Sequence, residues 1–130
     1  MLKLTEEQIN EAICSYLNYK ADGYAIRIAP SGFFKDGRMR KHRSKYIIKG
    51  VSDILYWSKG FFFAFEVKTP TAHKYIKKHG ERLRGLSPVK LNKGQIHIVE
   101  QIRFLEAIRQ QGFVAEFVSS IEDVKTILEC

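Results

Sequence analysis

Three charged residues with a defined spacing are the first candidates for chemistry in this 130-residue sequence: Asp53, Glu66 and Lys68. Glu66 and Lys68 lie two positions apart at the end of an apolar run, so in an extended strand their side chains point to the same face. Asp53 lies in another apolar run, 51–57, where a lone carboxylate is costly to bury without a partner. The short break at 58–60 predicts a hairpin that brings Asp53 close to Glu66.

Two neighbouring carboxylates repel each other unless a cation lies between them. Mg²⁺ prefers hard oxygen ligands, so we expect a site for Mg²⁺, which Mn²⁺ can replace, with Asp53, Glu66 and the backbone carbonyl of Val67 as ligands. Such a metal would activate water, while Lys68 would orient the nucleophile and offset negative charge on a phosphoryl group. The alternative interpretation is that Glu66 and Lys68 are a solvent-facing pair on a half-exposed strand and that Asp53 only ends a turn.

Two predicted helices add one polar residue each to this candidate site. Residues 5–20 form the first helix, with Thr5 as N-cap and Glu6 at the edge of its apolar stripe. Residues 95–111 form another, with Gln101 on the apolar face where a hydrophobic side chain is expected. Glu6 is alternatively a charge that compensates the helix dipole, and Gln101 a core residue with satisfied hydrogen bonds.

The remaining apolar and polar segments complete a single α/β domain over residues 1–130. We expect a long polar loop after the first strand and an insertion, with a possible short helix near 73–79, between the hairpin and the helix that carries Gln101. A last strand is followed by a helix capped by Ser119 or Ser120. The predicted strands are 24–30, 51–57, 61–68 and 113–118, and the two basic loops are 31–49 and 71–94.

The net charge of +8 and the sequence pI of about 9.6 indicate a polyanionic partner. Residues 35–49 and 73–93 each contain seven Lys or Arg and one acidic residue, so the positive charge is concentrated in two segments. We expect these segments to contact nucleic-acid phosphates. We interpret the four histidines as surface or phosphate-contact residues. The predicted contact residues are Lys35, Arg38, Arg40, Lys41, Arg43, Lys45, Lys49, Lys74, Lys77, Lys78, Arg82 and Arg84.

Cysteine usage and hydropathy bear on the class of protein. Cys14 and Cys130 are too few and too far apart for a disulfide framework, which favours a reducing compartment. No segment approaches the length of a membrane span, and the first residues lack the apolar core of a signal peptide. We expect a soluble cytoplasmic protein that acts on neither a membrane nor a small-molecule substrate.

Four segments together resemble the VRR-Nuc branch of the PD-(D/E)XK nucleases, over most of the chain. They are TEEQINEAICSYL, GVSDILYW, FFFAFEVKT and QIRFLEAIRQQGFVAEFVSSIEDV. The resemblance implies that Asp53 and Glu66 are metal ligands, that Lys68 is the catalytic lysine, and that Glu6 and Gln101 are accessory active-site residues, with Glu6 also near the metal. Val51-Ser52 replaces the proline that often precedes the aspartate. The long segment 71–94 leaves open whether Gln95 or Gln101 is the active-site glutamine.

The same resemblance implies a restriction-endonuclease-like core, αβββαβ, in which helices flank a central mixed sheet. It also implies a Mg²⁺-dependent endonuclease of a bacterial or phage-infected cell, acting on branched or flapped DNA, with junction resolution as one specialisation. A homodimer would suit paired cuts. Two alternatives stay open: a restriction-like or nicking nuclease, and a non-catalytic nucleic-acid-binding module.

Overall fold

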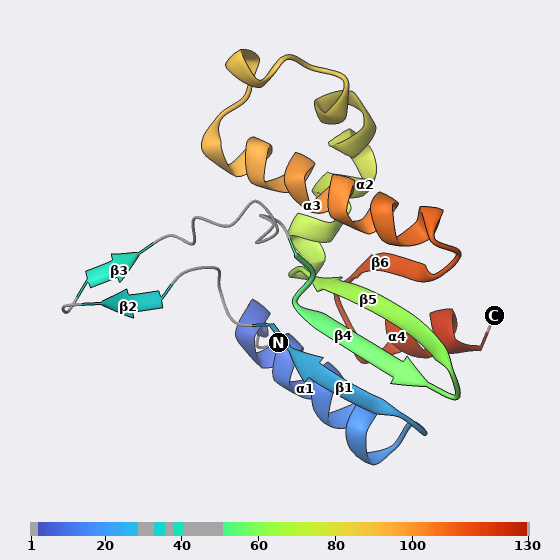
Figure 1. Cartoon of the computed structure of the whole chain (residues 1–130). Helices are drawn as coiled ribbons and strands as arrows, with labels where there is room; N and C mark the ends of the chain where they lie inside the picture. The colour runs from blue at the N-terminus through green and yellow to red at the C-terminus, as the bar shows by residue number, and fades with distance from the viewer. Residues whose placement is uncertain (1–2, 29–32, 36–37, 41–50, 130) are drawn as a thin grey trace.

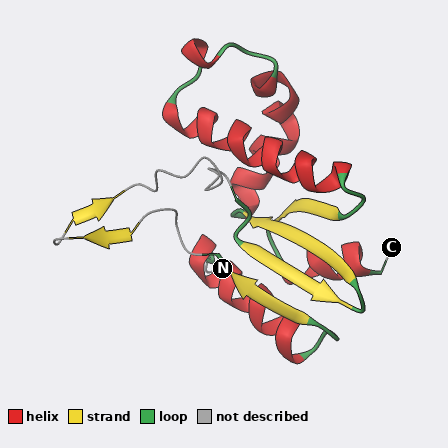
Figure 2. Cartoon of the chain, in the orientation of Figure 1, coloured by secondary structure: helices red, strands yellow, loops and turns green. Residues whose placement is uncertain are grey.

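A four-stranded sheet with helices on both faces forms the body of the protein, as the computed structural model shows for residues 3–28, 33–35, 38–40 and 51–129 (Figure 1). The helices are α1 (Glu6–Tyr19), α2 (Pro70–Arg84), α3 (Lys93–Gln110) and α4 (Ile121–Leu128), with a 3-10 turn, η1 (Pro88–Lys90), between α2 and α3. The strands are β1 (Tyr24–Arg27), β2 (Phe33–Lys35), β3 (Arg38–Arg40), β4 (Ile54–Ser58), β5 (Phe61–Val67) and β6 (Val114–Val118). The expected mixed sheet between helices is confirmed (Figure 2).

The main sheet has the order β1-β4-β5-β6. Strands β1 and β4, and β4 and β5, pair antiparallel, whereas β5 and β6 pair in parallel. The β4–β5 connection is a two-residue turn, because Ser58 pairs with Phe61. Lys59 and Gly60 both have positive φ, 50° and 79°, as this tight hairpin requires. The predicted hairpin is therefore confirmed, and its register is fixed by the turn.

Alternating residues of β5 divide the core into two layers. Phe65 and Val67 are fully buried against α1 and α4, together with Ile13 and Leu17 of α1. Ala64, on the opposite face, is buried with Leu105 of α3 and Ala115 of β6. Both faces of β5 are therefore covered, because α3 packs over the face that carries Glu66.

The helix termini follow their capping residues. Thr5 accepts a hydrogen bond from the Gln8 backbone, and the Gln8 side chain returns one to the Thr5 N–H, so the predicted N-cap of α1 is confirmed. Ser120, one of the two predicted caps, accepts from Asp123 N at the start of α4. In the part of the chain that is described, no helix is both long and apolar enough to cross a membrane.

The two predicted basic loops are corrected by the structure. The segment 71–94 is mostly α2 and the start of α3, because Thr69 caps α2 and Pro70 occupies its first turn, where a missing N–H costs nothing. Gly80 lies inside α2 against Ile102 of α3, where a Cβ would meet the Ile102 side chain at 3.4 Å. In the other segment, β2 and β3 pair as an antiparallel two-stranded sheet.

Side chains cover backbone groups at both outer edges of the main sheet. Asn18 of α1 binds Ala25 of β1 twice, through Nδ2 to the carbonyl at 3.0 Å and through Oδ1 from the N–H at 2.9 Å. At the opposite edge, Arg109 Nε donates to the Ala115 carbonyl of β6 at 2.7 Å. These are the backbone positions that a further strand would use.

Candidate active site

Asp53 and Glu66 face each other across the ends of β4 and β5. Asp53 lies one residue before β4, next to the Ile54–Phe65 pair, so it stands opposite Glu66 in the register. The Asp53 backbone N–H donates to Glu66 Oε2 at 3.0 Å, and the Val67 N–H donates to Asp53 Oδ2 at 2.9 Å. The hairpin therefore brings the two carboxylates together as expected, although Asp53 precedes the strand instead of lying within it.

Gln101 of α3 completes the buried part of the site. Its Nε2 donates to Glu66 Oε1, while its Oε1 is buried without a hydrogen-bond partner among the described residues. The Gln101 side chain reaches the carboxylates because α3 packs over Ala64, one step along the same face of β5. Gln95, the other candidate, instead caps α3 through Asn92 and lies near Tyr75.

Burial dominates the electrostatics of Glu66, which is only 2% exposed. Burial, with the charge of Asp53 and a hydrogen bond to its side chain, raises the pKa of Glu66 to about 9, although Lys68 opposes the rise. Without a cation, the pair therefore holds a proton at neutral pH. A cation at this pair would replace the proton, and its positive charge would offset the repulsion between the two carboxylates.

Lys68 and Glu6 lie in the same electrostatic cluster. Lys68 follows β5 directly, is half-buried, and donates its backbone N–H to Val118 of β6 at 2.9 Å. Partial burial raises the pKa of Glu6 and Asp53 adds to the rise, whereas Lys68 and His97 oppose it. Glu6 itself is exposed, and the charges of Lys68, Asp53 and His97 act on its pKa, so the first residue of α1 lies near the edge of the site.

Oxygen donors dominate the site. Asp53 and Glu66 supply carboxylates, and Gln101 adds the unpartnered amide oxygen. Over the described ranges, no three His, Cys, Asp or Glu side chains are grouped so that they could hold a metal ion, so Glu6 is not preassembled with the two carboxylates. Two carboxylates and further oxygens fit Mg²⁺, which usually keeps several of its waters.

His97 is a site residue that the sequence reasoning missed. It lies one helical turn before Gln101, and the two Nε2 atoms are 3.2 Å apart. The i, i+4 relation to a glutamine already placed in the site was the available signal. His73, in contrast, was expected to be a surface or phosphate-contact residue but is 8% exposed. It lies on the side of α2 that contacts Ser119, in the segment after β6.

A second polar cluster, which is partly buried, joins His73, Ser119 and Asp123. His73 Nδ1 lies 3.0 Å from Ser119 Oγ, which donates to Asp123 Oδ2 at 3.0 Å. The Ser119 backbone N–H donates to the same oxygen at 2.8 Å. Burial raises the pKa of Asp123, but the Ser119 hydrogen bonds and the charges of His73 and Lys77 outweigh it, so the pKa lies below its usual value.

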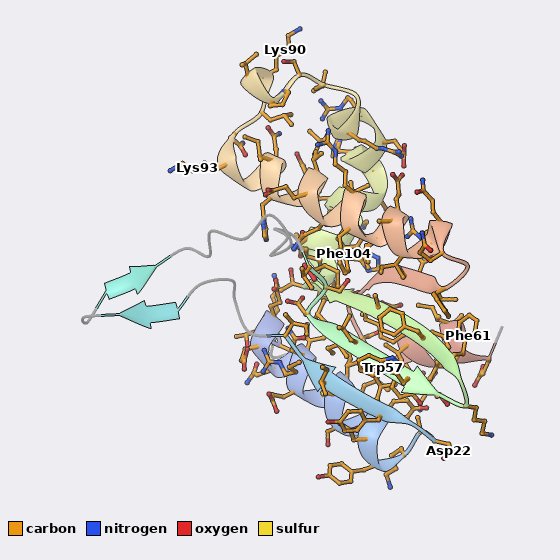
Figure 3. The ribbon with its side chains drawn as sticks, in the orientation of Figure 1. Asp22, Trp57, Phe61, Lys90, Lys93 and Phe104 are labelled. Carbon is orange, nitrogen blue, oxygen red and sulfur yellow. The ribbon has the colours of Figure 1, made fainter. Side chains whose placement is uncertain are left out.

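Five of the predicted phosphate contacts are exposed residues of α2: Lys74, Lys77, Lys78, Arg82 and Arg84. Arg84 differs from the others because it forms ion pairs with Glu106 and Glu81. Lys90 and Lys93 extend from the α2–α3 connection, at the opposite end of the molecule from Asp22 and Phe61 (Figure 3).

The other predicted contacts lie on or near the β2–β3 sheet. Lys35 ends β2, whereas Arg38 and Arg40 bound β3. Lys41, Arg43, Lys45 and Lys49 lie outside the described residues.

Comparisons with known proteins give no relative for this chain. No protein-family model matches the sequence, and no curated protein matches it either.

Proposed function

We propose that this protein is a Mg²⁺-dependent endonuclease of the VRR-Nuc type, with a restriction-endonuclease-like core. The observation that carries the proposal is the pairing of Asp53 with Glu66 at the ends of adjacent strands, through reciprocal backbone hydrogen bonds. Lys68 lies two residues beyond Glu66 and acts on its pKa. This combination of two carboxylates and an ammonium suits hydrolysis of a phosphodiester bond.

Asp53 and Glu66 would hold the cation, with the Val67 carbonyl as a further ligand and with Glu6, an accessory residue by the resemblance, near the metal. The bound cation would supply Lewis-acid stabilisation and a more acidic water. Lys68 would offset the negative charge that develops on the phosphoryl oxygens and help to orient the attacking water. Gln101 would keep Glu66 in place through the hydrogen bond from its Nε2.

The proposed substrate is DNA with a branched or flapped structure. The exposed lysines of α2 begin only a few residues after Lys68, so one helix links the site to a basic surface. Lys and Arg side chains on a helix bind phosphates regardless of base sequence. Selection by structure is therefore the proposed mode, and a restriction-like or nicking activity would instead cut linear duplex equally well.

Cleavage assays with a substrate panel test this proposal. Labelled linear duplex, flap and four-way junction should be incubated with Mg²⁺, with Mn²⁺ and with chelator. We expect Asp53→Ala to abolish cutting, a loss of about 1000-fold or more, while DNA binding is kept. Asp22→Ala is the matched control, because Asp22 is an exposed carboxylate that pairs with Lys59. Full activity of the Asp53→Ala protein in magnesium would contradict the assignment.

A non-catalytic nucleic-acid-binding module is the second candidate, and one observation favours it. Protein donors already bind both carboxylates: Val67 N–H binds Asp53, and Asp53 N–H and Gln101 bind Glu66. Such a network can stabilise the end of a hairpin without a metal. Binding that weakens steeply with salt, without cleavage of any substrate in Mg²⁺ or Mn²⁺, would identify this case.

A further inference from the structure

His97 lies one turn before Gln101 on the same face of α3 and contacts the candidate active site from its exposed end. Its Nε2 lies 3.2 Å from Gln101 Nε2, and its side chain is 58% exposed. It also affects the pKa of Glu6. An exposed histidine has little packing role, so its position beside a buried amide calls for a different reason.

The hydrogen-bonding groups in this contact determine which ring nitrogen of the neutral His97 imidazole carries the hydrogen. An amide nitrogen only donates hydrogen bonds, so His97 Nε2 has to accept. A neutral imidazole that accepts through Nε2 carries its hydrogen on Nδ1. His97 Nδ1 lies 4.0 Å from Glu100 Oε1, and the negative charge there favours a hydrogen on that side of the ring.

The same contacts determine the orientation of the Gln101 amide. Its two Nε2 hydrogens are used by Glu66 Oε1 and by His97 Nε2. Rotating the amide by half a turn would place Oε1 against the ionised Glu66 carboxylate, which is the form that would hold a cation, and two acceptors repel. Gln101 Oε1 is therefore left as a buried acceptor next to the carboxylates, without a partner in the part of the chain that is described.

We infer that His97 is a positioning residue that holds the Gln101 amide with its nitrogen on Glu66 and its oxygen free for a ligand of the site. The consequence for catalysis rests on the proposed nuclease function; the orientation itself does not. A free amide oxygen in this place suits a cation or a water bound to it. Without His97, the hydrogen bond to Glu66 Oε1 would be the remaining contact of the Gln101 nitrogen, so the amide would be held less firmly.

Nitrogen NMR of the imidazole tests the orientation without any substrate or metal. At about pH 10, where neutral imidazole is the ordinary form and Glu66, whose pKa is raised to about 9, is ionised, we expect His97 to be the Nδ1–H tautomer, with Nε2 resonating as an unprotonated ring nitrogen. In Glu66→Gln, the new amide nitrogen can donate to Gln101 Oε1, so Gln101 rotates and His97 should change to the Nε2–H tautomer. An Nε2–H tautomer, or an averaged mixture, in the unmodified protein would overturn the inference.

A rescue series tests the effect on cleavage. We expect His97→Ala to lower the rate by about 10-fold or more, and His97→Gln, which keeps an acceptor at the same distance along the side chain, to recover most of it. Gln110→Ala is the matched control, because Gln110 is an exposed residue at the far end of the same helix, and it should cut normally. Equal rates for His97→Ala and His97→Gln would overturn the inference. No cleavage by the unmodified protein, together with the expected tautomer, would reject the nuclease proposal alone.

Discussion

Two clusters of partly buried polar side chains in this fold differ in how completely their hydrogen bonds are satisfied. In the His73–Ser119–Asp123 cluster, each polar side chain contacts its neighbour, and the pKa of Asp123 is lowered. In the Asp53–Glu66–Gln101 cluster, the pKa of Glu66 is raised and Gln101 Oε1 is unpartnered among the described residues. The first cluster stabilises the ionised carboxylate of Asp123, whereas the second cluster destabilises the ionised carboxylate of Glu66.

This difference separates a structural network from a candidate functional one. A satisfied buried network contributes to stability and gains nothing from a ligand. A crowded carboxyl pair costs stability until something positive binds, and natural proteins keep such costs mainly at functional sites. The comparison therefore predicts opposite responses to mutation in the two clusters.

The largest expected effect is that of Glu66→Gln. Cleavage should fall by about 1000-fold, because a proposed cation ligand is lost. Stability in chelator should rise, since one pKa unit is worth about 1.4 kcal/mol and the pKa of Glu66 is raised from 4.5 to about 9. Urea unfolding at about pH 8 measures this gain. A clear loss of stability would show that Glu66 is structural like Asp123.

Asp123→Ala should have the converse effect. It removes an acceptor of two hydrogen bonds from Ser119 and a negative charge from the first turn of α4. We expect a loss of about 2 kcal/mol in the free energy of unfolding, with the cleavage rate of the folded protein unchanged. Asp22→Ala, which removes an exposed carboxylate, should change stability by less than about 0.5 kcal/mol. A fall in cleavage without unfolding would place Asp123 in the functional site.

The pH dependence of stability should report the two clusters separately. The folded pKa of Glu66 lies above its unfolded value, so its contribution is full below pH 4.5 and is lost as the pH rises toward about 9. The folded pKa of Asp123 lies below 3.8, so its contribution is present above that value and is lost on further acidification. Unfolding curves in chelator should lose the alkaline slope in Glu66→Gln and the acid slope in Asp123→Ala. Unchanged slopes in both variants would contradict the comparison.

The smallest effect is expected at the exposed face of α2, the helix that carries His73. Replacing Lys74 and Lys78 with Gln should reduce the slope of log affinity against log salt by up to about 2, since each phosphate contact contributes about 0.9. The matched control replaces Lys59 and Lys125, which pair with Asp22 and Glu122, and removes the same charge. Equal changes in both double variants would mean that α2 is not the DNA-binding surface.

Local signals in the sequence predicted much of the fold and the core of the site. The Lys59-Gly60 turn set the β4–β5 register, and this register alone brought Asp53 opposite Glu66. The helical period placed Gln101 on the buried face of α3. These predictions succeeded because each depends on residues close in sequence or on a fixed turn length.

The failures involve contacts between distant segments. Gly80 lies in the segment that was predicted to be a basic loop, but it is the small residue that lets α2 pack on Ile102 of α3. His73 is buried by Ser119, which lies 46 positions away. The role of His97 depends on Glu66 being under Gln101. None of these pairings has a local period or turn that could reveal it.

The side chains of Asn18 and Arg109 restrict how two copies of this protein could associate. A second molecule that lengthened the sheet beyond β1 or β6 would have to displace one of these side chains from Ala25 or Ala115. The new hydrogen bonds between strands would replace hydrogen bonds that these side chains already make. The addition of further strands at β1 or β6, and so the growth of fibrils, is therefore disfavoured. The homodimer expected from the sequence would instead have to form through helices or through the β2–β3 sheet.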